Sequence, residues 1–214
     1  MRIMKDADER KNEILDAAER IFSQKGFEQT SISDIIETVG VARGTIYYHF
    51  KSKESIMDAL IERHHVRVLA RAEEIAADKS IAVPQRLVMA VMAMKPDQAG
   101  TSVMIEHIHK PQNALMHQKV HARMIEDIPP VLAKIAGDGI KEGIFETPYP
   151  TESIEMFISY VNTVFDNDMV STTQQQMLSR MAAFITNLER VFGAKPGVFA
   201  GVMYLFDAGE TNNG

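Results

Sequence analysis

Apolar residues recur at helical spacing through most of the chain, which predicts helices rather than strands. The first such segment, residues 9–25, ends at Gly26 and places on one face Ile14, Leu15, Ala18, Ile21 and Phe22. A long segment, residues 53–77, follows Ser52, a residue type that favours the N-terminal cap of a helix. Its inward positions are predicted to be Ile56, Met57, Leu60, Ile61, Val68, Leu69, Ala72 and Ile75.

Two short helices are predicted between these segments. Residues 32–39 follow Ser31, and Asp34 stands three positions later, so the two residues form a weak capping box. Residues 43–49 form the second helix, and Gly40 suits the tight turn before it. Two short helices joined by a turn that contains glycine are typical of a helix-turn-helix. The second helix is expected to turn outward Arg43, Gly44, Thr45, Tyr47, Tyr48 and His49.

The second part of the chain predicts longer helices that are interrupted by prolines. Pro111 and Pro129 suit the first turn of a helix, where the missing N–H has no bond to lose. Thr172 and Gln175 are spaced as a capping box. No segment alternates between apolar and polar residues, so the predicted fold class is all-α. The further helices are expected at residues 84–94, 101–109, 112–125, 129–142, 152–167 and 173–192.

Charge and composition narrow the class of protein. The net charge is −6, yet residues 41–71 hold six Lys or Arg against three Asp or Glu, and such a local patch is compatible with DNA. The chain has no cysteine, which excludes disulfides and thiolate metal sites. The N-terminus lacks the apolar core of a signal peptide, and no apolar run is long enough to span a bilayer. A soluble cytoplasmic protein is therefore expected.

The residues from Arg10 to Lys53 carry a specific resemblance. The positions that carry it are Ile14, Leu15, Ala17, Ala18, Phe22, Gly26, Phe27, Thr30, Ser31, Ile32, Ile35, Gly40, Val41 and the run from Gly44 to Glu54. In residue type and spacing across three helices, this stretch resembles the DNA-binding domain of the TetR family of transcriptional regulators. The resemblance implies a helix-turn-helix domain at 1–52 and a helical effector-binding and dimerisation domain at 53–206. Residues 207–214 are expected to be a disordered tail.

The resemblance also implies roles for single residues toward double-stranded operator DNA. Arg43 and Gly44 stand where the family reads bases, since arginine can bond guanine and glycine permits close approach. Phe50 is expected to be core, and Ala42 departs from the serine that many relatives carry as the cap of the recognition helix. Thr30 is a fainter candidate for a contact. Contacts to phosphates, thymine methyls or bases are implied for Ser31, Ser33, Thr45, Tyr47, Tyr48, His49 and Lys53.

The last two predicted helices have apolar stripes broader than one core-facing side requires. Surplus apolar surface usually marks an interface, and in the TetR family these helices pair with their symmetry mates. A homodimer is therefore expected, although a single thick core would give the same pattern. The predicted interface residues are Phe157, Ile158, Val161, Phe165, Met181, Phe184 and Leu188.

Methionines gather in the middle helices, where the family keeps a pocket for a small-molecule effector. Flexible thioethers suit adaptable apolar binding, but methionines at helical spacing more often belong to a plain core. The segment His107–Asn113 and the spacing of Gly139, Gly143 and Phe145 also resemble TetR-like regulators of Gram-positive bacteria. The predicted pocket residues are Met89, Met92, Met104, His107, Met116, His117 and Met124.

Four histidines fall within residues 107–121, and His117 and His121 are spaced to share one helical face. This pair could bind a divalent metal with Glu106 or Glu126, while ordinary polar histidines are the alternative. The sequence thus predicts a repressor that a small molecule releases from its operator by shifting helix 53–77, with a metal-responsive regulator as the alternative. No cofactor is expected. An enzyme is not expected either, because the sequence shows no nucleophile–base pair and no phosphate-binding loop. A third possibility is an architectural DNA-binding protein without an effector.

Overall fold

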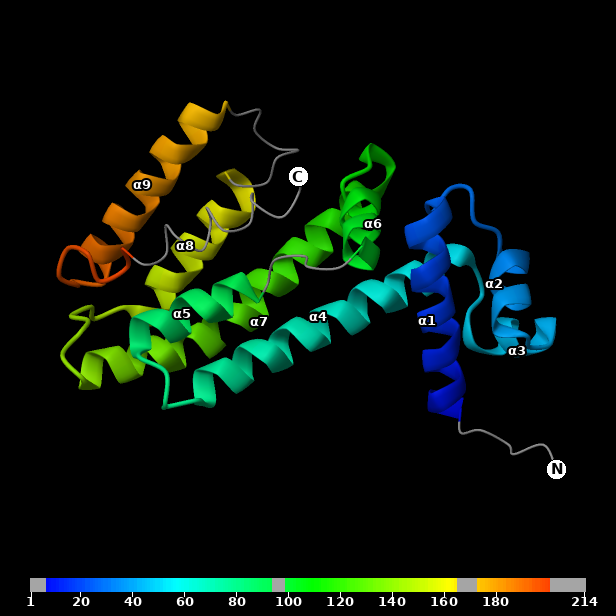
Figure 1. Ribbon diagram of the computed structural model, residues 1–214, viewed down its shortest axis with the longest axis horizontal. Coiled ribbons are helices and arrows are strands. Elements are labelled where there is room, and N and C mark those ends of the chain that lie inside the picture. Colours follow the sequence, from blue (N-terminus) through cyan, green and yellow to red (C-terminus); the bar gives the residue numbers. More distant parts are fainter. Residues whose placement is uncertain (1–6, 94–98, 165–172, 201–214) are drawn as a thin grey trace. The chain divides into compact units, whose positions relative to one another are not determined.

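The computed structural model describes residues 7–93, 99–164 and 173–200, and every regular element in this part of the chain is a helix (Figure 1). The all-α prediction is confirmed. None of the described helices combines the length and the apolar character needed to cross a bilayer. The elements are α1 (Ala7–Lys25), α2 (Ile32–Val39), α3 (Arg43–His49), α4 (Lys53–Ala77), α5 (Val83–Met92), α6 (Ala99–Ile108), the 3₁₀ turn η1 (Pro111–Asn113), α7 (Ala114–Lys141), α8 (Pro150–Val164) and α9 (Gln174–Val191).

The chain divides into two compact units, and each combines two separate stretches of sequence. Unit 1 comprises Met1–Arg67 and Pro96–His117, and unit 2 comprises Val68–Lys95 and Gln118–Gly214. Unit 1 therefore holds α1, α2, α3, α6 and the first part of α4. The functional boundary at residue 52 stays a prediction, and the predicted tail at 207–214 lies outside the described residues.

The core of unit 1 forms where one face of α1 meets α2, α3 and α4. Ile14, Ile35 and Ile46 are fully buried there, one from each of the first three helices. Arg63 of α4 lies 2.7 Å from carboxylate oxygens of both Asp16 and Glu19 of α1. Apolar packing and this pair of ionic hydrogen bonds together fix α4 against α1. The two short helices, α2 and α3, pack on this pair.

The core of unit 2 gathers side chains from α4, α5, α7, α8 and α9. Phe192 and Phe199 both pack on Phe145, with ring centroids 5.1 and 5.8 Å from that of Phe145. The buried carboxylate of Glu189 accepts hydrogen bonds from the backbone N–H groups of Gly197 and Phe199, at 2.8 and 3.1 Å. The segment after α9 is thus packed on the core as far as Phe199.

Gly139 explains part of the motif that it forms with Phe145. A Cβ added at Gly139 would collide with the ring of Phe145, which leaves no room for a side chain there. Ile144 and Phe145 also donate backbone hydrogen bonds to the Gly139 carbonyl, at 2.8 and 3.1 Å. The glycine therefore permits the chain leaving α7 to fold closely back onto the helix.

One predicted boundary is wrong, because α7 runs without a break through Pro129 and Pro130. The prolines remove two donors from the helix, at about 3 kcal/mol each relative to alanine. The helix continues because its buried face is continuous across them, with Ile128, Val131 and Leu132 all in the core. Burial on both sides outweighs the local preference that the sequence prediction relied on.

A second prediction is displaced by one residue. The cap of α9 is Thr173 with Gln176, rather than Thr172 with Gln175. The repeats of threonine and glutamine at 172–176 offer the same spacing twice, so local sequence does not distinguish the two registers.

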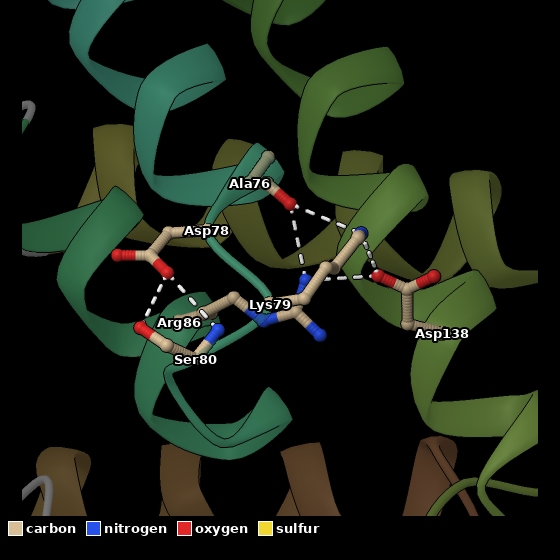
Figure 2. Close-up of polar contacts among 6 residues, drawn as sticks. All are labelled: Ala76, Asp78, Lys79, Ser80, Arg86 and Asp138. Carbon is tan, nitrogen blue, oxygen red and sulfur yellow. Dashed lines mark hydrogen bonds and ion pairs between the residues drawn. The ribbon is translucent and has the colours of Figure 1, made fainter.

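The C-terminal end of α4 is held by a polar cluster within unit 2 (Figure 2). Arg86 and Lys79 both donate to the carbonyl of Ala76, at 3.0 and 3.2 Å, and both bond the carboxylate of Asp138 on α7. Lys79 and Arg86 hold the pKa of Asp138 below its usual value. Positive side chains at the carbonyl end of a helix are stabilising, so the cluster anchors this end of α4.

Candidate nucleic-acid interface

The recognition-helix candidate α3 is fixed from below by its apolar residues. Ile46 is fully buried and Phe50, the C-terminal cap, is 4% exposed, as predicted for a core residue. At the other end, Ala42 makes no side-chain cap hydrogen bond. The departure at Ala42 therefore leaves the helix without the bond that a serine would supply, at a cost of roughly 0.5–2 kcal/mol relative to a serine.

The outward side of α3 is aromatic and basic. Tyr48 is 79% exposed and Tyr47 41%, which is unusual for residues of this size. The Arg43 guanidinium lies 5.5 Å from the centre of the Tyr47 ring, a cation–π contact. His49 meets Tyr48 edge-on with ring centroids 4.9 Å apart. With Gly44 exposed, Thr45 half-buried and no acidic residue on the helix, this side can face a polyanion.

The start of α2 carries two further candidates. Ser31 and Ser33 are both exposed, and Ser31 forms the predicted capping box with Asp34. The backbone N–H of Ser31, the Lys25 ammonium and the Ser31 hydroxyl together lower the pKa of Asp34 to about 2. Thr30 is buried instead, and its hydroxyl donates to the carbonyl of Gly26 at 2.8 Å. The Thr30 hydroxyl therefore has no hydrogen left for a ligand, and the Ser31 hydroxyl likewise donates its hydrogen to the Asp34 carboxylate, at 2.8 Å.

Lys53, the first residue of α4, lies in an arrangement that the sequence did not predict. Its ammonium donates to the carbonyl of Phe27 at 2.7 Å and to that of Glu28 at 3.4 Å. The same nitrogen lies 4.3 Å from the centre of the Phe27 ring. These contacts join α4 to the turn between α1 and α2. They occupy two of the three hydrogens with which Lys53 would bind a phosphate.

The predicted interface residues fall into two groups. Phe157, Ile158 and Leu188 are buried in the core of unit 2, so they contribute to the fold of a single chain. Val161, Met181 and Phe184 are half-buried, and Phe165 lies outside the described residues. The large apolar side chains that α8 and α9 do expose are Met156, Tyr160, Leu178 and Val191.

The predicted pocket residues belong to both units. Met104, His107, Met116 and His117 lie in unit 1, and Met89, Met92 and Met124 lie in unit 2. Met104 is part of the core that carries α1, α2 and α3. His107 is 4% exposed, and its ring packs against Phe27 at 4.0 Å between centroids. Burial of the imidazole is the main cause that lowers the pKa of His107, and the positive charge of the nearby Lys110 is the second.

The predicted histidine pair does not lie in a larger cluster of metal ligands. Across residues 7–93, 99–164 and 173–200, no three histidine, aspartate or glutamate side chains gather closely enough to hold an ion. The ring of His117 instead meets that of His109 edge-on at 4.9 Å. The metal-responsive alternative gains no support from this arrangement.

Comparisons with known proteins agree with the helix-turn-helix geometry. Residues 14–60 match the family model of bacterial regulatory proteins, tetR family, and residues 99–187 match that of the Tetracyclin repressor-like, C-terminal domain. The HTH-type transcriptional regulator UidR of Escherichia coli is 31% identical over 118 residues, 53% of this chain and 59% of that protein. TtgR of Pseudomonas putida, also an HTH-type transcriptional regulator, is 41% identical over 75 residues, 34% of this chain and 36% of that protein.

Solved structures show the same fold. The SmeT–triclosan complex aligns with a TM-score of 0.58 and 20% identity, covering 89% of this chain and 94% of that one. The chain spans only about a third of the length of TtgR and three fifths of that of UidR. Residues 14–60, which hold the candidate interface, match the tetR family model, and the likeness to SmeT over 89% of this chain extends the shared fold beyond them.

Proposed function

We infer that this chain, which belongs to the tetR family of bacterial regulatory proteins, is a repressor of transcription that binds operator DNA as a homodimer and releases it when a small molecule binds. The observation that carries the proposal is the outward side of α3. There Arg43, Tyr47 and Tyr48 are exposed on a helix with no acidic residue and a fully buried underside. Such a helix can enter the major groove, with its first residues nearest the base edges.

Each contact on this surface has a separate chemical task. Arg43 is proposed to read guanine through its two parallel donors, and Gly44 beside it allows close approach. The hydroxyls of the exposed residues Ser33 and Tyr48 are proposed to bond phosphates, which fix orientation without reading sequence, whereas the Ser31 hydroxyl already donates to the Asp34 carboxylate at 2.8 Å. Tyr47 supports Arg43 through their cation–π contact and orients the guanidinium.

A dimer follows from the geometry of DNA, because two recognition helices must meet half-sites roughly 34–36 Å apart. We propose that the exposed apolar residues of α8 and α9, Met156, Tyr160 and Leu178, form its centre, with Met181 beside them. The aromatic stack of Tyr160 on Phe184, with centroids 5.8 Å apart, links this surface to the buried core. Phe157, Ile158 and Leu188 then support the interface from within.

The effector is proposed to be a small, largely apolar molecule, since the methionines of α5, α6 and α7 suit such ligands. The SmeT complex with triclosan supports this class by analogy of fold. Helix α4 runs from the end of the candidate interface into unit 2, so an effector that favours a different position of α4 would shift the population away from the DNA-binding form.

Selection of duplexes from a random-sequence pool tests the proposal. A DNA-binding regulator should enrich a sequence with twofold symmetry, whereas failure to enrich any duplex would overturn the proposed function. On the enriched duplex, Arg43→Ala should lose about 1–3 kcal/mol of binding free energy and relax the preference at one base position. Arg71→Ala removes an exposed arginine paired with Glu74 and serves as the matched control. Equal losses on selected and random DNA would assign Arg43 to the backbone instead.

A further inference from the structure

The turn between α1 and α2 is contacted by two segments that are distant in sequence. From α4, Lys53 bonds the carbonyls of Phe27 and Glu28 and lies over the Phe27 ring. His107, in the last turn of α6, packs on the same ring, and Lys110, just after α6, forms an ion pair of 3.2 Å with the Glu28 carboxylate. All five residues belong to unit 1, so these contacts lie within one compact body.

The end of α6 is shaped to make these contacts. The side-chain amide of Asn113 donates to the carbonyl of His107 at 2.7 Å and lies 3.2 Å from His107 Nε2. This holds the imidazole in place against Phe27, and the backbone N–H of Asn113 bonds the Lys110 carbonyl at 2.8 Å. The sequence of the segment His107–Asn113 resembles that of TetR-like regulators, but this resemblance assigned it no role. In the structure, this segment is a compact turn at the end of the helix.

We propose that His107, Lys110 and Asn113 form a latch, the α6 latch, that regulates DNA binding by holding the α1–α2 turn in its binding-competent position. This inference rests on the proposed function, because it concerns control of the same interface. The turn leads directly into Ser31, the cap of α2, and Lys53 follows Phe50, the cap of α3, by three positions. A displacement of the turn therefore reaches both helices of the candidate interface.

Two features limit the stability of the closed α6 latch, so that little free energy is needed to open it. His107 Nδ1 is buried and has no hydrogen-bond partner among the described residues, which opposes burial of the ring. The ion pair of Lys110 with Glu28 is partly exposed and therefore weak. An effector that displaces α6 would free the turn inside each subunit, which is a different event from a change in the spacing between two subunits.

The ion pair provides a test because simple electrostatics and the latch predict opposite signs for the variant that removes the negative charge. Near DNA, removing a negative charge by Glu28→Gln should strengthen binding, and removing a positive charge by Lys110→Met should weaken it. If the latch operates, both variants should weaken binding to the selected duplex by about two- to fivefold, the range that one exposed ion pair supplies. The double variant should be no weaker than either single variant, because the same contact is lost.

The experiment is a fluorescence anisotropy titration of the full chain with the selected duplex. Glu73→Gln and Lys134→Met break another exposed ion pair, in unit 2, and should leave affinity unchanged. His107→Phe, which keeps a ring against Phe27, should preserve affinity, whereas His107→Ala should reduce it. If His107→Ala does not fold, the variants of the exposed ion pair, Glu28→Gln and Lys110→Met, still test the latch. Stronger or unchanged binding by Glu28→Gln would overturn the latch while leaving the proposed function intact, since that function fails only if no duplex is selected.

Discussion

The guanidinium of Arg86, with only 2% of its side chain exposed, donates a hydrogen bond of 2.8 Å to the carboxylate of Asp138. Arginine is almost never buried this deeply without an acidic partner. The bond ties α5 to α7, and the second bond from Arg86, to Ala76, adds the end of α4. One buried cation therefore fastens three helices of unit 2, as the converging side chains in Figure 2 show.

We expect Asp138→Ala to lower the free energy of unfolding by about 3 kcal/mol, because it leaves Arg86 buried without a countercharge. Arg86→Met combined with Asp138→Ala should be less destabilising than Asp138→Ala alone, since the double variant leaves no buried unpaired charge and Lys79, the other partner of Asp138, is exposed. Urea unfolding followed by circular dichroism measures both. As a control, Glu73→Ala removes an exposed partner of Lys134 and should change stability by less than about 1 kcal/mol. A double variant as unstable as the single variant would contradict this account of the cluster.

Two carboxylates predict how stability depends on acid. The pKa of Asp34 is lowered to about 2 by bonds from Ser31 and Lys25, and that of Asp138 is lowered from 3.8 by Lys79 and Arg86. A carboxylate whose pKa is lower in the folded than in the unfolded chain stabilises the fold at pH values above its unfolded-state pKa. This stabilisation is lost as the pH falls through its folded-state pKa. We therefore expect stability to fall between about pH 4 and pH 2. Asp34→Asn and Asp138→Asn should each flatten this fall in urea titrations at several pH values, and an unchanged slope would contradict the assignment.

The sequence predicted local structure well where the signals are themselves local. The bounds 32–39, 43–49 and 53–77 are confirmed, because the caps at Ser31 and Ser52 and the turn at Gly40 fix them within a few residues. The break at Pro129 was wrong, since tertiary burial outweighs a local preference. Local pattern also could not separate a residue buried in its own chain, such as Phe157, from one that is exposed, such as Met156.

Contacts between distant residues were beyond the sequence pattern altogether. Lys53 and Phe27 are 26 positions apart, and Lys110 and Glu28 are 82 apart. Nothing in residue type at these positions signals that they meet, and the family resemblance assigned Lys53 to DNA. The candidate interface on α3 was predictable because its residues share one short helix, whereas the contacts of the α1–α2 turn with His107 and Lys110 required the fold.

Lys53 gives a prediction that separates its two roles. Because its ammonium is bonded to the α1–α2 turn, we expect Lys53→Met to lower the free energy of unfolding by about 1 kcal/mol. The slope of log affinity against log salt concentration should stay unchanged, whereas loss of a phosphate contact would reduce it by about 0.9. Anisotropy titrations at several salt concentrations measure the slope. Lys51→Met, which removes an exposed lysine two positions earlier, is the control for stability and should have no effect on it.

The exposed and buried apolar residues of α8 and α9 should behave differently on substitution. Leu178 is 52% exposed, and we propose that a second copy of the chain covers it. Leu178→Glu should raise the dimer dissociation constant at least about tenfold, because burying an unpaired carboxylate costs more than about 1.4 kcal/mol. Its thermal unfolding as a monomer should be unchanged, since the side chain lies outside the core.

Phe157→Ala should lower the stability of the fold and leave dimerisation intact, the opposite of the effect expected for Leu178→Glu. Its ring is 7% exposed and packs on Phe184 and Phe192, with centroids 5.3 and 6.2 Å away, so its loss should lower stability by about 3–5 kcal/mol. The part of this variant that remains folded should still form dimers in sedimentation velocity runs over a range of concentrations. Tyr149→Glu, at an exposed position before α8, is the matched control for Leu178→Glu and should remain dimeric. A dimer that survives Leu178→Glu but dissociates in Phe157→Ala would place the interface on the other side of α8.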